Sequence, residues 1–80
     1  MKTSNGISTR MRNLMTAHIG KTYNYFRGGY QWMWSVKIIG LMDNTGYFIT
    51  ELNDGRSTWQ SNASYGEITH NIKKGLLVLA

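Results

Sequence analysis

Most of the aromatic side chains of the sequence lie in residues 21–34, together with Lys21 and Arg27. Six aromatic rings alternate there with basic and small residues. Rings stack on unpaired bases while Lys and Arg contact phosphates, so the combination is typical of single-stranded nucleic-acid binding. Tyr25, Arg27 and Tyr30 lie beside the Gly28-Gly29 pair, and we expect them to be exposed.

A core role is the competing interpretation for the tryptophans. Trp32 and Trp34 share a period-two face with Val36 and Ile38. Such alternation is typical of a half-buried strand, so the pattern predicts both rings on the core side. We expect Trp59 to be a core residue as well.

The charge is distributed unevenly along the 80-residue chain, whose formal net charge is +5. Residues 1–42 contain six basic and no acidic residues, whereas residues 43–80 contain three basic and four acidic ones. The asymmetry predicts a positive face that meets an anionic partner. The residues that we expect to bind it are Arg10, Arg12, Lys21, Tyr25, Arg27, Tyr30 and Lys37.

Catalytic and metal-binding patterns are missing from the sequence. The two histidines, His18 and His70, are far apart and there is no Cys to join them in a metal site. Asp43 and Asp54 fall in turn clusters, and Glu67 has the spacing of a helix cap. A small basic ribonuclease built on Arg, Lys, Tyr and His is the enzymatic alternative, but no signature supports it. We therefore expect a protein that is not an enzyme and needs no cofactor.

The N-terminal part of the chain has the pattern of a helix. Apolar residues recur at helical spacing between Ile7 and Ile19, and Ser8 or Thr9 can cap the start. Gly20 can end the helix in the left-handed conformation. The pattern predicts a helix over residues 9–19, with His18 as a hydrogen-bonded residue at the edge of the core.

After Gly20 the apolar period changes to two, which predicts a β-meander over residues 22–61. Turn residues at 43–46 and the Asn-Asp-Gly cluster at 53–55 divide the meander. The predicted strands cover residues 22–26, 30–41, 47–52 and 56–61.

The C-terminal part predicts a second helix and a last strand. Ser64 and Glu67 have capping-box spacing, which predicts a short helix over residues 64–74. A terminal strand is expected over residues 76–80. With residues 1–6 as a flexible lead, the whole chain, 1–80, is expected to be a single domain.

Residues 36–61 resemble SH3-like or Tudor-like small β-barrels. The run contains a strand ending in Val36-Lys37-Ile38-Ile39-Gly40, an Asp-Gly hairpin at 54–55 and the closing sequence Trp59-Gln60-Ser61. The resemblance implies a module that binds peptides, nucleic acids or modified side chains. It names no particular ligand.

These observations predict an α+β, mainly β domain: a small, strongly bent antiparallel sheet or SH3-like barrel with an N-terminal helix and a short C-terminal helix. The expected function is non-enzymatic binding of single-stranded or duplex nucleic acid through a basic, aromatic face. The alternative is a small phage- or mobile-element-encoded inhibitor that docks on an acidic surface of a host protein. No apolar run approaches the about 20 residues that span a bilayer, so we expect a cytoplasmic protein without a membrane partner. A homodimer is compatible with the sequence.

Overall fold

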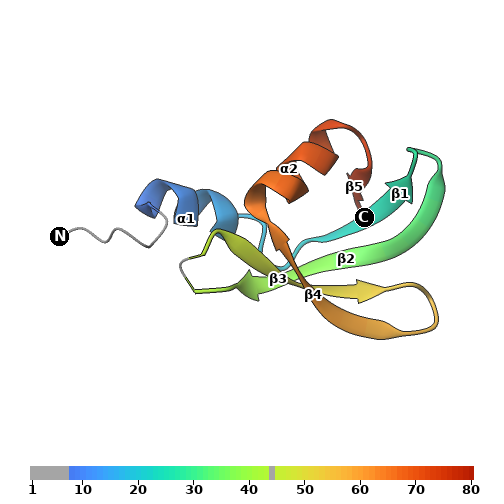
Figure 1. The fold of residues 1–80 in the computed structure, drawn as a ribbon, viewed down its shortest axis with the longest axis horizontal. Helices are drawn as coiled ribbons and strands as arrows, with labels where there is room; N and C mark the ends of the chain where they lie inside the picture. Colours follow the sequence, from blue (N-terminus) through green and yellow to red (C-terminus); the bar gives the residue numbers. More distant parts are fainter. Residues whose placement is uncertain (1–7, 44) are drawn as a thin grey trace.

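The computed structural model describes residues 8–43 and 45–80, so the predicted lead over residues 1–6 lies outside the described residues. The described residues form two helices and five strands in succession (Figure 1). In chain order they are α1 (Thr9–Thr16), β1 (Thr22–Arg27), β2 (Gln31–Leu41), β3 (Tyr47–Asn53), β4 (Thr58–Ser64), α2 (Tyr65–Lys73) and β5 (Leu77–Leu79).

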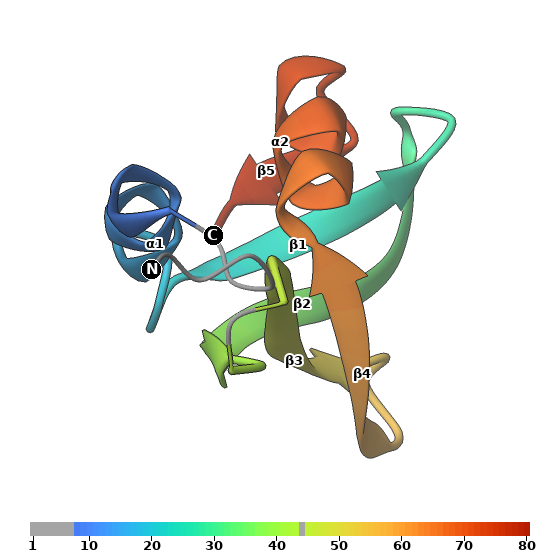
Figure 2. The same ribbon diagram turned by 60° about the vertical axis from the view of Figure 1, so that its left-hand side comes forward.

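The five strands form one antiparallel sheet in the order β4-β3-β2-β1-β5. β1 to β4 make a meander, and β5 returns after α2 to pair with β1. β4 and β5 are the two edges, so the sheet is open. Figure 2 shows the strong bend, with β4 running steeply across the direction of β1. The predicted α+β, mainly β fold is confirmed, in the form of the bent antiparallel sheet.

Both predicted helices are present, but the first is shorter than expected. Ser8 caps α1, because its hydroxyl oxygen accepts from the Met11 N–H at 3.1 Å. The helix ends at Thr16 and not at residue 19 as predicted. Tighter turns follow Thr16, because the His18 N–H donates to the Met15 carbonyl, three residues back. Gly20 has the predicted left-handed conformation (φ 90°). Its N–H donates to the Ile38 carbonyl, so the chain has already joined the sheet at this point.

The second helix starts at its predicted cap. The Ser64 hydroxyl accepts from the Glu67 N–H at 3.0 Å, and α2 ends at Lys73 with Lys74 as its C-cap. The predicted short C-terminal helix is therefore confirmed, and α2 lies within the predicted range of 64–74 with Ser64 and Lys74 as its caps. β4 extends to Ser64, three residues beyond the predicted end of the meander, and runs directly into the helix.

Loss of the Ser64 cap should destabilise the protein measurably. We expect Ser64→Ala to lower the free energy of unfolding by about 1 kcal/mol, because the Glu67 N–H loses its acceptor. Urea unfolding followed by tryptophan fluorescence measures the change. Ser57→Ala is the control, since it removes a serine hydroxyl beside the other end of β4. An unchanged midpoint for Ser64→Ala would show that the cap contributes nothing.

The core lies between the helices and one face of the sheet, which we call the inner face. Its fully packed members come from both helices and from four strands. They are Met15, Tyr23, Val36, Ile38, Phe48, Ile68 and Leu77. In the described part of the chain, neither helix is long and apolar enough to cross a membrane.

Two β-bulges in the pairing of β2 change which way its side chains point. Tyr25 pairs with Trp34 but Phe26 pairs with Trp32, so Met33 is an extra residue. Ile39 is extra in the same way against β3. A bulge breaks the period-two alternation on which the sequence prediction rested. The prediction that Trp32 shares a core face with Trp34 is therefore wrong.

Candidate nucleic-acid interface

The sheet face turned away from the core, which we call the outer face, is crossed by rows of paired residues. One row runs through all five strands and is made of uncharged residues. Its members are Val78, Asn24, Ser35, Asn53 and Thr58. The next row contains Thr22, Lys37, Glu51 and Gln60. The core packs on the inner face with both helices, so these rows face away from α1 and α2.

Trp32 lies on this outer face beside the β1–β2 hairpin. Its indole N–H donates to the side-chain oxygen of Asn24 at 3.0 Å, and its side chain is 43% exposed. Asn24 stands between Tyr23 and Tyr25, which both face the core side, and therefore points outward. The hydrogen bond thus holds a partly exposed ring at a fixed position on the sheet.

The hairpin itself adds a second ring and a cation. Tyr30 is 83% exposed, and Arg27 ends β1 as an exposed residue opposite Gln31. The position that a Cβ would take at Gly28 is 2.9 Å from the Tyr30 ring. Gly28 also has a φ of 65°, in the left-handed region. Glycine at this position therefore allows the turn and leaves room for the Tyr30 ring. Arg27 and Tyr30 are thus exposed, as expected.

Hydrogen bonds also order the polar members of the first row, Asn24, Ser35, Asn53 and Thr58, which we call the polar row. The Ser35 hydroxyl donates to the Asn53 carbonyl at 3.4 Å, and the Asn53 side-chain amide donates to the Thr58 hydroxyl at 3.1 Å. These bonds leave further amide and hydroxyl groups available on the surface. The row therefore offers donors and acceptors next to Trp32.

The predicted cations separate into two groups. Of the predicted cations, only Arg27 is at the hairpin end of β1, opposite Gln31. Lys37 is exposed on the outer face opposite Glu51 and lies beside Lys21, because Lys37 pairs with Thr22 and the Ile38 N–H donates to the Lys21 carbonyl. Arg10 and Arg12 are exposed on α1, and exposed Lys21 precedes β1. The six residue steps from Lys21 to Arg27 span about 20 Å of extended strand. The structure therefore does not gather all five cations at one point.

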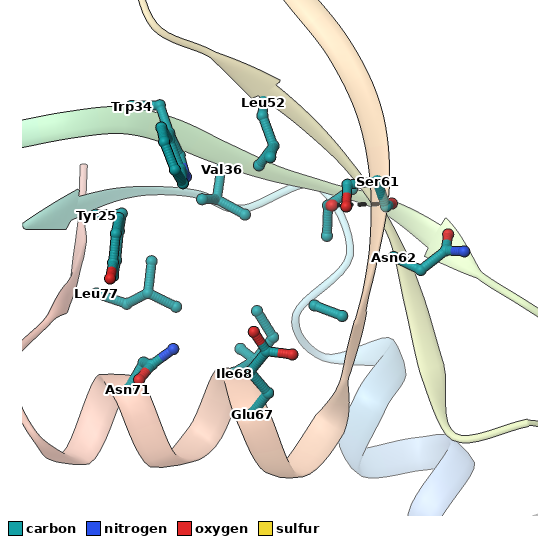
Figure 3. Close-up of a pocket in the computed structure, with 12 residues that line it drawn as sticks. Tyr25, Trp34, Val36, Leu52, Ser61, Asn62, Glu67, Ile68, Asn71 and Leu77 are labelled. Carbon is teal, nitrogen blue, oxygen red and sulfur yellow. Dashed lines mark hydrogen bonds between the residues drawn. The ribbon is translucent and has the colours of Figure 1, made fainter. Parts of the chain in front are cut away.

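Tyr25 lies apart from the other predicted binding residues, on the inner face. Its ring stacks on Trp34 with centroids 5.4 Å apart, and both rings line a cavity of about 280 Å³ between the sheet and α2. Figure 3 shows Glu67 and Asn71 reaching into this cavity from α2, opposite the two rings. Trp59 contacts Trp34 edge-on at 6.0 Å and is 38% exposed. The thickness of the sheet separates this aromatic group from Trp32.

His18 lies at the edge of the core, as the sequence suggested. Its Nδ1 is hydrogen-bonded to the Tyr23 hydroxyl at 2.9 Å, and its ring meets Phe48 and Tyr65 edge-on. Burial lowers the pKa of His18, and the nearby Lys21 ammonium lowers it further. Burial raises the pKa of Tyr23, so this hydroxyl keeps its proton. Within the described residues, no three His, Asp or Glu side chains come together as a metal site.

His18 makes the stability of the fold depend on pH. Its pKa in the folded state is below the ordinary value of 6.5, so the unfolded chain binds the proton more readily. We expect the melting temperature to fall as the pH drops through 6.5. His18→Gln should flatten this decline, whereas His70→Gln on the exposed side of α2 should not. Equal declines in all three proteins would contradict the assignment to His18.

No protein-family model, curated protein or solved structure matches this chain. The role of the outer face therefore has to be inferred from the side chains that it carries.

Sequence reasoning missed part of this surface. The period-two pattern predicts Trp32 in the core, and no motif in the sequence marks the polar residues Asn24, Ser35 and Asn53. Strand alternation did place Asn24 on the face opposite Tyr23 and Tyr25, which was the available signal. Nothing in the sequence marks the extra residue at Met33 that turns Trp32 outward.

Proposed function

We propose that this protein is a non-enzymatic module that binds single-stranded nucleic acid across the outer face of its sheet. One observation carries the proposal: Trp32, partly exposed and fixed by Asn24, lies on the open sheet face beside the exposed hairpin residues Arg27 and Tyr30. A sheet face with exposed rings offers stacking platforms for unpaired bases. The polar row through Ser35 and Asn53 supplies donors and acceptors for base edges.

The cations suit a strand that runs over several nucleotides. Lys37 is on the outer face beside Lys21, whereas Arg27 ends β1 at the hairpin, about 20 Å away along the strand. Arg10 and Arg12 are on α1, which precedes Lys21 in the chain. Sites of about 4–16 nucleotides are common on small β domains that bind single strands. A strand of that length reaches both groups, with its bases on the sheet and its phosphates on the cations.

The resemblance of residues 36–61 to SH3-like domains supports binding in general and not this ligand in particular. The strand order is compatible with it, because a meander is followed by a fifth strand that returns to β1. Function depends on the site and not on the fold. The proposal therefore rests on the outer-face side chains.

Inhibition of a host protein is the second candidate function, and α1 supplies the observation that favours it. Leu14 is 45% exposed and lies one helical turn from the exposed Arg10, and Ile19, three residues beyond the end of α1, is 39% exposed. Apolar side chains beside arginine are typical of protein interfaces. In this case Leu14→Ala should weaken capture of the protein target, while nucleic-acid binding is absent.

The proposal is tested by fluorescence anisotropy with labelled single-stranded DNA, single-stranded RNA and duplex DNA. We expect micromolar or tighter binding to single strands, with affinity falling steeply between about 50 and 200 mM salt. Weaker binding to the duplex would agree with base stacking. No binding to any of the three at the lowest salt would reject the proposal and favour the protein target.

The contribution of Arg27 to nucleic-acid binding can be compared with that of Lys73, a cation on α2 and away from the outer face. Arg27→Ala should weaken binding and reduce the salt slope by about 1, as expected for one lost phosphate contact. Lys73→Ala removes one positive charge from the exposed last turn of α2 and should change the slope little. Equal effects of the two substitutions would show that net charge alone drives binding, without a site on the outer face.

A further inference from the structure

β4 leaves one side of its backbone without a neighbouring strand. It ends the strand order, so within the described residues only β3 pairs with it. Residues 58–62 are all exposed. Native proteins usually protect such an edge with charges, Pro, bulges or a short strand. β4 is seven residues long, contains neither a charged residue nor Pro, and pairs with β3 in an uninterrupted register.

The hydrogen bonds at both ends of the β3–β4 pair show which backbone groups face outward. The Asp54 N–H donates to the Ser57 carbonyl at 3.3 Å, and the Tyr65 N–H donates to the Gly46 carbonyl at 3.0 Å. Hydrogen-bonded and non-hydrogen-bonded pairs alternate in an antiparallel ladder, so Trp59 and Ser61 bond to β3. The N–H and C=O groups of Thr58, Gln60 and Asn62 therefore point away from the sheet.

The outward N–H and C=O groups of Thr58, Gln60 and Asn62 can pair with the same groups of a second copy of the chain. In an antiparallel pair of two β4 strands centred on Gln60, Thr58 of each copy lies opposite Asn62 of the other. The same register places the large Trp59, 38% exposed, opposite the small Ser61 of the second copy. A two-fold axis satisfies both edges at once. The β4 strand carries none of the cations of this +5 chain, so no like charges lie opposite each other along the paired strands.

We propose that the protein forms a homodimer by antiparallel pairing of its β4 edges, with Gln60 next to Gln60 at the two-fold axis and a continuous ten-stranded sheet. The other edge does not offer the same match, because β5 is only three residues long. The proposal is independent of nucleic-acid binding. Each copy contributes one seven-residue strand to the contact, whereas a standard interface of about 1,600 Å² involves about 20–30 residues a side, so we expect a weak dimer that dissociates on dilution.

Sedimentation equilibrium over a concentration series tests the proposal. The apparent mass should rise with concentration from the 9.2 kDa of one chain toward twice that value. Gln60→Lys and Gln60→Glu should each remain near the mass of one chain, because like charges then lie directly opposite each other. An equimolar mixture of the two variants should recover the dimer, because opposite charges then meet at the axis.

Gln31→Lys is the matched control. It adds the same charge at an exposed position on β2, away from β4, and should dimerise as the original chain does. Far-UV circular dichroism confirms that each variant is folded. The proposal is overturned if the original chain stays monomeric at its solubility limit, or if Gln60→Lys dimerises as Gln31→Lys does. It is also overturned if folded Gln60→Lys and Gln60→Glu remain monomeric when mixed.

Discussion

Replacing Phe48 by Ala is expected to leave much of the protein unfolded at 25 °C. Phe48 is fully buried, and its ring meets His18 and Tyr65 at 5.8 and 6.2 Å. Truncation of a buried Phe costs about 3–5 kcal/mol, through lost burial and the cavity that remains. An 80-residue domain has a total stability of about 4–12 kcal/mol, and small domains lie toward the lower end. This one substitution therefore removes most of the free energy of unfolding.

Urea unfolding followed by tryptophan fluorescence measures this loss. Tyr47→Ala is the control, because Tyr47 precedes Phe48 in the same strand but is 46% exposed. We expect its effect to stay below about 1 kcal/mol, as for most exposed substitutions. A Phe48→Ala protein with nearly the original midpoint would mean that the core is not organised around this ring.

Replacing Trp32 by Ala should produce the largest single loss of nucleic-acid affinity. Stacking of one base on an aromatic ring contributes about 1–3 kcal/mol, which corresponds to a loss of about 5- to 150-fold. Trp32→Phe keeps a ring but loses the hydrogen bond to Asn24, so it should retain part of the affinity. Anisotropy titrations with labelled single-stranded DNA at one salt concentration measure both variants.

Trp59→Ala is the matched control for Trp32→Ala. The two side chains have similar exposed fractions, 38% and 43%, but Trp59 contacts Trp34 on the inner face. Its loss should leave the affinity nearly unchanged as long as the variant is folded. Equal losses for Trp59→Ala and Trp32→Ala would exclude a binding site specific to the outer face.

Local signals were enough to predict most of the elements. Ser8 and Ser64 accept from the N–H groups three residues on, as their cap positions require. The hairpin at 53–55 also follows from local chemistry, since the Asp54 carboxylate accepts from the Arg56 and Ser57 N–H groups. These two bonds lower the pKa of Asp54. Such features depend on neighbours within about four residues, which the sequence displays directly.

The candidate site could be predicted only in part. Arg27 and Tyr30 flank a glycine pair and are exposed as expected, since tight turns place their neighbours at the surface. Tyr25 was expected beside them but stacks on Trp34 above the cavity. A single strand does not reveal which of its two faces will be covered, because the covering helix α2 comes some forty residues later.

The class of this protein could be predicted from the order of its residues, through its helix caps, its turns, its period-two strands and its basic N-terminal half. Each of these follows from local backbone preferences or from composition. The tertiary structure alone decided that Trp32 faces outward, that the cations form two groups and that β4 is left as an open edge. The physical reason is that bulges and strand order arise from pairing between distant segments, and one extra residue reverses the face of every side chain beyond it.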